Sequence, residues 1–354
     1  MRDHFQCAAQ ALERFGLDAV LVTGESNRRY VTGFPSSAGA ALVTKKRAYF
    51  FTDARYIEAA QNAVSGAVVL QTDGKHPYAD RINDALAENR VEKLGFEDGE
   101  MTVSAYTAYR EKLRAELVPA QKLFVFLRQS KSREELETMI RAQRIAESAL
   151  EGVLPMLRGS RERDIAAELV YRMVRAGAED KSFDPIVVSG KKTSMPHGVP
   201  DDTVIGDGFV TIDFGCRVDG YCSDETRTFC LGSPTDEMVR VYDTVLAAQK
   251  AGIAAAKAGV PGREIDAAGR AVIEQAGYGA YFGHAFGHSL GLDIHEAPNA
   301  SPLCGDPIPA GAVISAEPGI YLPGRFGVRI EDVLYITADG CEDITKTPRN
   351  LIIL

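Results

Sequence analysis

In the first 127 residues, segments with helical spacing of apolar residues alternate with short apolar runs typical of strands. Helices are predicted over 3–16, 54–64, 78–89 and 103–116, and strands over 18–23, 40–44, 48–52, 67–70, 93–96 and 122–127. Strands that alternate with helices favour an α/β domain. We therefore expect such a domain at 1–127, with no chemistry concentrated in it.

The pattern changes near residue 128, where a helix-start signal precedes a long amphipathic segment. Ser132-Arg-Glu-Glu135 has the spacing of a capping box, and apolar residues follow at helical spacing. These features predict a second domain at 128–354 that begins with a helix over 132–157.

The second domain contains a weak internal repeat with an offset of one hundred residues. Gly159 and Gly177 bracket one predicted helix, and Gly259 and Gly277 bracket another of the same length. Each half is therefore predicted to contain a long helix, a shorter helix and a strand pair. The long helices are expected at 132–157 and 236–258, and the strand pairs at 205–231 and 311–338.

Acidic residues fall at matching places in the two strand pairs. Asp213 and Asp224 flank a turn, and the alternation of side chains along a strand puts both carboxylates on one face. This pair alone is equally typical of a polar face in solvent. Glu317 and Glu331 occupy the corresponding places around a turn at Pro323-Gly324. Two carboxylate pairs at one centre favour a metal site, because clustered carboxylates repel one another without a cation.

Four of the six histidines lie near these acids: His197, His284, His288 and His295. The spacing of His284 and His288 does not indicate a zinc-peptidase helix, because the Glu that would follow the first His is absent. Carboxylates with one imidazole suit Mn²⁺, with Co²⁺ or Zn²⁺ as alternatives. Four acids and one His fit a bridged pair of ions that activates a water molecule.

Composition narrows the classes of partner. The chain has 354 residues, a net charge of −9 and 45% hydrophobic residues, which fits a protein of two domains with ample core. The negative charge disfavours nucleic acid, and no apolar run is long enough for a membrane span. The six scattered cysteines are typical of reduced thiols, so we expect a cytoplasmic protein.

The motifs around the acids and histidines resemble the metallo-aminopeptidases of the pita-bread fold, in the branch of Xaa-Pro dipeptidase (prolidase) and aminopeptidase P. They cover most of residues 130–354 in the family's order: Pro196-His197-Gly198, I-D-F-G at 212–215, S-D-E-T-R-T at 223–228, G-H-S-L-G-L at 287–292, H-E-A-P at 295–298, E-P-G-I-Y at 317–321 and V-R-I-E-D at 328–332. The resemblance implies an α+β fold, with a pita-bread domain of pseudo-twofold repeat after a smaller α/β domain of the creatinase/prolidase N-terminal type. It also implies a homodimer.

The resemblance assigns the metal ligands. Asp213 would bind one ion, His288 and Glu317 would bind the other, and Asp224 and Glu331 would bridge both. Glu317 would also exchange protons with the attacking water.

The resemblance also assigns residues that contact the substrate. His197, His284 and His295 would contact it, with His197 or His295 stabilising the tetrahedral intermediate. Arg329 would orient the bridging acids or bind a substrate carboxylate, and a purely structural role is an equal alternative. Glu225 stands where the family usually has an apolar residue, and we expect it to face away from the metals.

The implied activity is that of an exopeptidase. It would hydrolyse the bond between an N-terminal residue and proline in short peptides with proline in second position, as a dipeptidase or as an aminopeptidase. A creatinase-like C–N hydrolase and a catalytically inactive binding protein on the same scaffold are the alternatives. Both would be expected to lack ligands, whereas this chain keeps all five.

Overall fold

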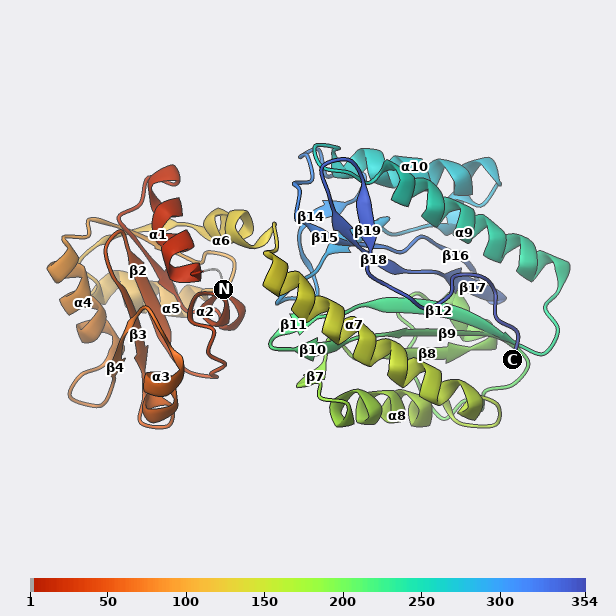
Figure 1. The fold of residues 1–354 in the computed structure, drawn as a ribbon, viewed down its shortest axis with the longest axis horizontal. Coiled ribbons are helices and arrows are strands. Elements are labelled where there is room, and N and C mark those ends of the chain that lie inside the picture. The colour runs from red at the N-terminus through yellow and green to blue at the C-terminus, as the bar shows by residue number, and fades with distance from the viewer. Residues whose placement is uncertain (1–2) are drawn as a thin grey trace. The chain divides into compact units, whose positions relative to one another are not determined.

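The computed structural model describes residues 3–354, and the chain divides into two compact units, Met1–Arg128 and Gln129–Leu354 (Figure 1). Within the described residues, no helix is long and apolar enough to cross a membrane.

The first unit contains a six-stranded mixed sheet in the order β4-β3-β2-β1-β5-β6. Its strands are β1 (Ala19–Val22), β2 (Ala40–Thr44), β3 (Ala48–Thr52), β4 (Val68–Gln71), β5 (Lys93–Phe96) and β6 (Glu116–Pro119). Its helices are α1 (His4–Arg14), α2 (Glu25–Thr32), α3 (Ile57–Ala63), α4 (Tyr78–Asn89), α5 (Val103–Lys112) and α6 (Gln121–Arg128). The apolar faces of β1, β2 and β3 and of α4 form one core.

Two sequence predictions in this unit are wrong, and one helix was missed. The run 122–127 is a helix and not a strand, because Leu123, Phe124 and Leu127 are buried along one helical face. The end of the helix predicted at 103–116 is instead the edge strand β6, paired in parallel with β5. The polar helix α2 was not predicted at all.

The second unit contains two helix pairs and the strands between them. The helices are α7 (Arg133–Val153), α8 (Glu162–Arg175), α9 (Asp236–Ala255) and α10 (Gly262–Gln275). The strands are β7 (Asp180–Lys181), β8 (Ile186–Ser189), β9 (Gly208–Phe214), β10 (Cys216–Val218), β11 (Tyr221–Cys222), β12 (Glu225–Leu231), β13 (Gly287–Ser289), β14 (Glu296–Ala300), β15 (Val313–Ala316), β16 (Gly319–Leu322), β17 (Phe326–Arg329), β18 (Asp332–Ile336) and β19 (Cys341–Asp343). The capping box at Ser132 and Glu135 is confirmed.

The two halves of this unit have matching layers. α7 and α8 pack on the sheet β12-β9-β8, around residues such as Leu150, Leu169 and Val210. α9 and α10 pack on strands of the second half, and Figure 1 shows the strands of the unit lying between α8 and the pair α9 and α10. The predicted sequence of long helix, shorter helix and strand pair is therefore present in both halves.

Each predicted strand of the second half is interrupted. The segments 312–321 and 327–335 form β15 and β16, and β17 and β18, with breaks at Glu317-Pro318 and at Ile330-Glu331. β16 and β17 make the hairpin, while β15 pairs with β18. In the first half the hairpin is likewise broken, between β9 and β10 and between β11 and β12. The acidic residues near these breaks can therefore face inward at the centre of the unit.

Candidate metal centre

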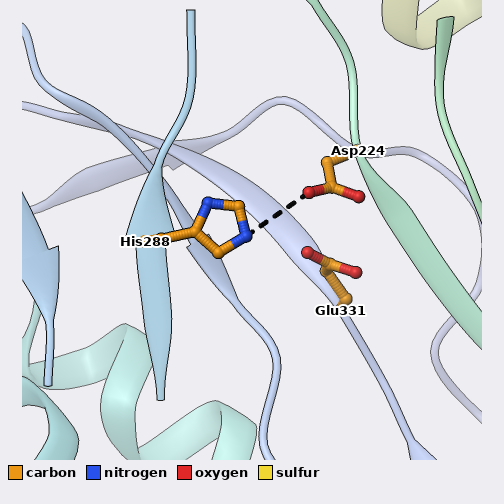
Figure 2. A group of neighbouring side chains, drawn as sticks. All are labelled: Asp224, His288 and Glu331. Carbon is orange, nitrogen blue, oxygen red and sulfur yellow. Dashed lines mark ion pairs between the residues drawn. The ribbon is translucent and has the colours of Figure 1, made fainter. Parts of the chain in front are cut away.

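Three of the predicted ligands form a compact cluster. Ligand atoms of Asp224, His288 and Glu331 all lie within 4.8 Å of one another. Figure 2 shows the His288 ring on its strand pointing toward the carboxylates of Asp224 and Glu331. His288 lies in β13, Asp224 directly precedes β12, and Glu331 directly precedes β18. The cluster therefore joins the two halves of the unit.

The other two predicted ligands lie beside this cluster. His288 Nε2 is 3.2 Å from Glu317 Oε1 and 3.6 Å from Asp224 Oδ2. Asp213 pairs with Thr226 in the β9–β12 ladder, which places Asp224 diagonally across from it, on the same face of the hairpin. All five line one cavity of about 510 Å³.

Local hydrogen bonds fix the His288 ring and the Glu317 carboxylate. The Nδ1 of His288 is 3.2 Å from the carbonyl of Ser289, to which it donates, so Nε2 is the ring nitrogen that faces the acids. Ser315 Oγ accepts from the His288 amide at 3.0 Å and donates to Glu317 Oε1 at 2.9 Å. This arrangement suits an imidazole that binds a metal through Nε2.

The four carboxylates do not have ordinary acidity. Burial and then the charge of Asp213 raise the pKa of Asp224 well above its usual value, and burial and then the charge of Asp224 do the same to the pKa of Glu331. Burial also raises the pKa of Asp213, against the charge of Arg329. With all four acids ionised, the cluster would therefore hold more negative charge than a buried site tolerates without a cation.

His288 and Glu317 form an ion pair within this cluster. Burial lowers the pKa of His288, but the hydrogen bond to Glu317 and the charges of Glu317 and Asp224 raise it to about 9. Burial raises the pKa of Glu317, and the contacts with His288 outweigh this effect and lower it to about 2. A proton on His288 stands where a metal cation would stand, and the two compete for the same lone pair.

Two buried carboxylate oxygens without hydrogen-bond partners in the described residues indicate that a metal ion would fit this site. Asp213 Oδ1 and Glu331 Oε1 are buried and have no hydrogen-bond partner among residues 3–354. Buried acceptors are nearly always satisfied, so orphaned oxygens in a carboxylate cluster are the donors that a hard or borderline divalent ion requires. The residues therefore fit the metal centre that the sequence predicts.

The remaining histidines also line the cavity. His284 Nδ1 is 2.8 Å from the Ala285 carbonyl and its Nε2 is 2.9 Å from the Tyr321 hydroxyl, and burial lowers the pKa of His284. The His295 ring meets that of His288 edge to face at 4.4 Å, and burial and the charge of His288 lower its pKa. His284 and His295 thus present neutral imidazoles to the cavity, beside His197.

Arg329 is buried and its donors are engaged. Nη2 donates to Asp213 Oδ2 at 2.6 Å, Nε donates to Thr226 Oγ1 at 3.1 Å, and Nη1 donates to the Tyr321 hydroxyl at 2.9 Å. Among the predicted ligands, its direct contact is therefore with Asp213 and not with the acids predicted to bridge. It reaches Glu331 only through Thr226, whose hydroxyl donates to Glu331 Oε2 at 2.7 Å.

The structure also adds residues that the sequence did not single out, three in the cavity lining and one, Tyr321, beside it. Phe183, Ile186 and Ile294 supply apolar wall, and Tyr321 links Arg329 to His284. Tyr321 lies within a motif already noted, so its position after Glu317 could have indicated it. Glu225 faces away from the cavity, as expected, and accepts from Gln143 Nε2 at 2.8 Å.

Comparisons with known proteins agree with this geometry. Residues 137–338 match the model of metallopeptidase family M24, and residues 6–130 match the creatinase/prolidase N-terminal domain. The uncharacterized peptidase YqhT of Bacillus subtilis is 41% identical, over 96% of this chain and 97% of its own length.

Solved structures are similar over the whole chain. An Xaa-Pro dipeptidase from Bacillus anthracis superposes with a TM-score of 0.95 at 42% identity, with 99% of each chain covered. An X-Pro aminopeptidase from Thermotoga maritima superposes with a TM-score of 0.91 at 33% identity, covering 97% of this chain and 99% of its own. The chain is therefore a metallo-exopeptidase that belongs to metallopeptidase family M24, in the pita-bread branch of prolidase and aminopeptidase P.

Proposed function

We propose that this protein hydrolyses the peptide bond between an N-terminal residue and proline with a centre of two divalent ions. The observation that carries the proposal is the meeting of five ligand side chains from both halves in one cavity, with buried oxygens of Asp213 and Glu331 left unpaired. Four carboxylates and one imidazole exceed what one catalytic ion of three protein ligands needs.

The ligands divide between the ions as follows. Asp213 would hold one ion, His288 and Glu317 would hold the other, and Asp224 and Glu331 would contribute to both. When bound, the ions would supply a nucleophilic water at neutral pH and polarise the scissile carbonyl. Arg329 opposes the effect of burial on the Asp213 pKa and orients this carboxylate through their contact at 2.6 Å.

The chain's own groups handle the proton and the substrate. The carboxylate of Glu317 takes a proton from the attacking water and returns it to the leaving proline nitrogen. His197 or His295 donates to the oxygen that becomes negative, and His284 contacts the substrate chain. The apolar wall of Phe183, Ile186 and Ile294 packs on the substrate and excludes water.

Further properties belong to the same proposal. The ions are manganese, with cobalt or zinc able to substitute, because oxygen donors predominate. The protein is a homodimer, which gel filtration with light scattering would test. A cytoplasmic location is supported by six free cysteines in the described residues.

The test is hydrolysis of Xaa-Pro and Xaa-Pro-Yaa peptides by metal-stripped protein supplied with Mn²⁺, Co²⁺ or Zn²⁺. We expect metal-dependent cleavage of at least one series, and no cleavage when the N-terminal amine is acetylated. Cleavage of dipeptides alone defines a dipeptidase, whereas cleavage of the longer series defines an aminopeptidase. Failure of both series with every metal would contradict the proposal, and turnover of creatine instead would indicate a C–N hydrolase.

A further inference from the structure

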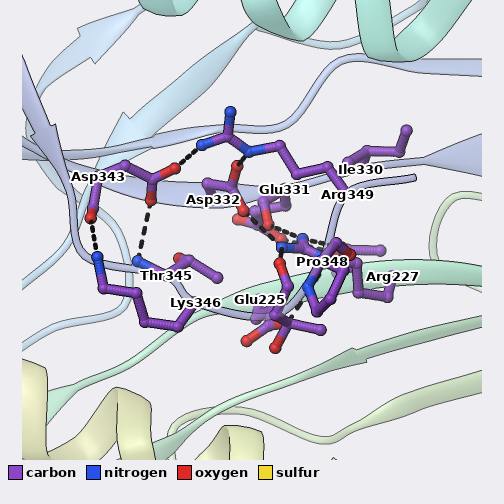
Figure 3. Close-up of polar contacts among 12 residues, drawn as sticks. Glu225, Arg227, Ile330, Glu331, Asp332, Asp343, Thr345, Lys346, Pro348 and Arg349 are labelled. Carbon is purple, nitrogen blue, oxygen red and sulfur yellow. Dashed lines mark hydrogen bonds and ion pairs between the residues drawn. The ribbon is translucent and has the colours of Figure 1, made fainter.

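Five polar side chains lie fully buried on the side of the acid-bearing strands that faces away from the cavity. Figure 3 shows part of this cluster, including Glu225, Arg227 and Asp332. Each of the five is at most 1% exposed: Gln143, Glu225, Arg227, Gln249 and Asp332. None of them lines the cavity, so substrate contact does not account for them.

The cluster repeats the pseudo-twofold symmetry of the unit. Glu225 directly follows Asp224, and Asp332 directly follows Glu331. Each of these acids accepts a hydrogen bond from a glutamine on the long helix of its own half. Gln143 on α7 donates to Glu225 at 2.8 Å, and Gln249 on α9 donates to Asp332 at 3.0 Å.

Arg227 is shared by the two acids. Its Nη2 donates to Asp332 Oδ1 at 2.7 Å, and its Nε lies 3.8 Å from Glu225 Oε1. Its Nη1 donates to two backbone carbonyls, that of Thr226 at 2.9 Å and that of Glu331 at 2.5 Å. One guanidinium thus joins the strand that follows Asp224 to the segment that carries Glu331.

The same guanidinium fastens a third segment. Nη2 also donates to the Thr347 carbonyl at 2.7 Å, and Nε donates to the Pro348 carbonyl at 3.0 Å. Arg349 pairs with Asp332 as well. The C-terminal segment therefore closes the cluster and completes the set of acceptors around Arg227.

Gln249 adds a link to the ligand backbone. Its Nε2 is 3.2 Å from the carbonyl of Ala316 and 3.3 Å from that of Ile330, the residues that directly precede Glu317 and Glu331. Both strands are interrupted at these points. The cluster thus holds the backbone where the regular β-ladder does not.

Burial makes Arg227 decisive for this arrangement. A buried carboxylate that loses its counter-ion is strongly destabilising, and the structure shifts to let water or a proton reach it. Lysine does not replace arginine here, since a single ammonium group cannot reproduce the planar fork that reaches both halves. Of the two acids, Glu225 therefore depends more on this side chain, since Asp332 also pairs with Arg349.

We propose that Arg227 is a positioning residue for the two-ion centre: through Glu225, Asp332 and the Glu331 carbonyl it sets the separation of the bridging carboxylates Asp224 and Glu331. This inference rests on the proposed ligand set. It acts on metal affinity, because a bridged pair of ions requires both carboxylates at a fixed spacing.

The test is metal titration of stripped protein, wild type and Arg227→Gln, by calorimetry with Mn²⁺ and by metal analysis after dialysis. We expect two ions per wild-type chain, and for the folded variant a loss of about 10- to 100-fold in the affinity of at least one ion. Arg227→Lys should recover part of that loss, because it restores the charge without the fork. Circular dichroism of the metal-free proteins establishes that each variant is folded.

Tyr242→Phe is the matched control. Tyr242 is buried and its hydroxyl donates to the Arg349 carbonyl at 2.8 Å, so it also holds the C-terminal segment, through a hydrogen bond that does not involve a predicted ligand. It should bind both ions with wild-type affinity. An equal loss in Tyr242→Phe would show that any loosening of this segment suffices, which would overturn the proposal.

The outcomes separate this inference from the proposed function. Two ions in the wild type with unchanged affinity in Arg227→Gln, or in Arg227→Lys if the first variant does not fold, would overturn the role of Arg227 alone. A wild-type chain that binds no divalent ion would overturn the ligand set and this inference together. Reduced affinity in the Arg227 variants, with the control unchanged, would support it.

Discussion

The two halves of the catalytic unit use the same scaffold for different tasks. β8 and β13 occupy corresponding places beside β9 and β15 in their sheets. β13 presents His288 to the cavity, whereas β8 presents Ile186, which lies opposite Asp213. Each half supplies two of the predicted carboxylate ligands, and the predicted imidazole ligand comes from the second. The difference teaches that one scaffold can place acids from both halves at a shared centre, while the same strand position carries a predicted ligand in one half and an apolar side chain in the other.

Helix packing around Phe286 holds in place the strand of the second half that carries His288. A Cβ at Gly252 of α9 would lie 2.1 Å from the Phe286 ring, and one at Gly269 of α10 would lie 2.5 Å from it. The two glycines therefore let both helices pack closely against the ring. The backbone carbonyl of Phe286 accepts a hydrogen bond from the Glu317 amide at 2.8 Å. The core of the second half therefore fixes the strand that carries His288.

The largest effect is expected where the two halves meet. Asp224→Ala should lower kcat/KM for Xaa-Pro peptides by more than about 100-fold, since even the loss of a residue that only supports a metal ligand costs 10- to 100-fold. Steady-state kinetics at saturating Mn²⁺ checks this. Asp219→Ala, an exposed acid of the nearby turn, is the control and should keep wild-type turnover. Near-normal turnover in Asp224→Ala would rule out a bridging role.

Metal removal should make the stability of the protein depend on pH through the carboxylates at the centre. Burial raises the pKa of Asp224 and of Glu331, so the metal-free folded state keeps protons that the unfolded state releases above about pH 4. Its unfolding free energy should therefore fall as pH rises from about 5 to 8.

His288 acts in the same direction. Its pKa, lowered by burial but raised to about 9 by Glu317 and Asp224, contributes stability that is present below about pH 6.5 and lost as pH rises toward 9. Thermal melts with chelator and with Mn²⁺ check both effects, since bound metal should remove or reverse the trend. Chelated protein whose melting temperature rises over this range would contradict the assignment.

The apolar wall should affect substrate binding without affecting metal. Ile186→Ala should raise KM about tenfold with little change in kcat, because losing a few methylenes in a pocket costs about 1–3 kcal/mol. Val204→Ala, exposed and outside the cavity lining, is the control. Loss of bound metal in Ile186→Ala would contradict the claim that this wall contacts substrate and does not support metal binding.

The smallest effect concerns the starts of the two long helices. α7 begins with a full capping box at Ser132, whereas α9 begins with Thr235, which only accepts from the Met238 amide. Ser132→Ala should cost about 1–2 kcal/mol of unfolding free energy and Thr235→Ala about 1 kcal/mol, in urea titrations. Neither should change metal content, and a changed metal content would show that the caps serve more than the helices.

The sequence predicted these halves well because their signals are local. The capping box, the glycines that bracket α8 and α10, and the matching acids each depend on short spacings. The run 122–127 was misassigned because a short apolar segment does not distinguish a strand from a buried helix.

The polar cluster around Arg227 could not be predicted from the sequence, for a different reason. Arg227 and Asp332 are 105 positions apart, and their contact follows from the packing of the two halves. The breaks in the strands at Glu317 and Glu331 depend on the same packing. Periodicity carries no information about such contacts, so the sequence could indicate only site residues that lie within local motifs.

The most direct test of the two-ion centre is anomalous diffraction from crystals of this protein grown with Mn²⁺. We predict two peaks in the cavity, one beside Asp213 and one beside His288 and Glu317, with Asp224 and Glu331 contacting both. A single peak, or peaks away from these five side chains, would contradict the account.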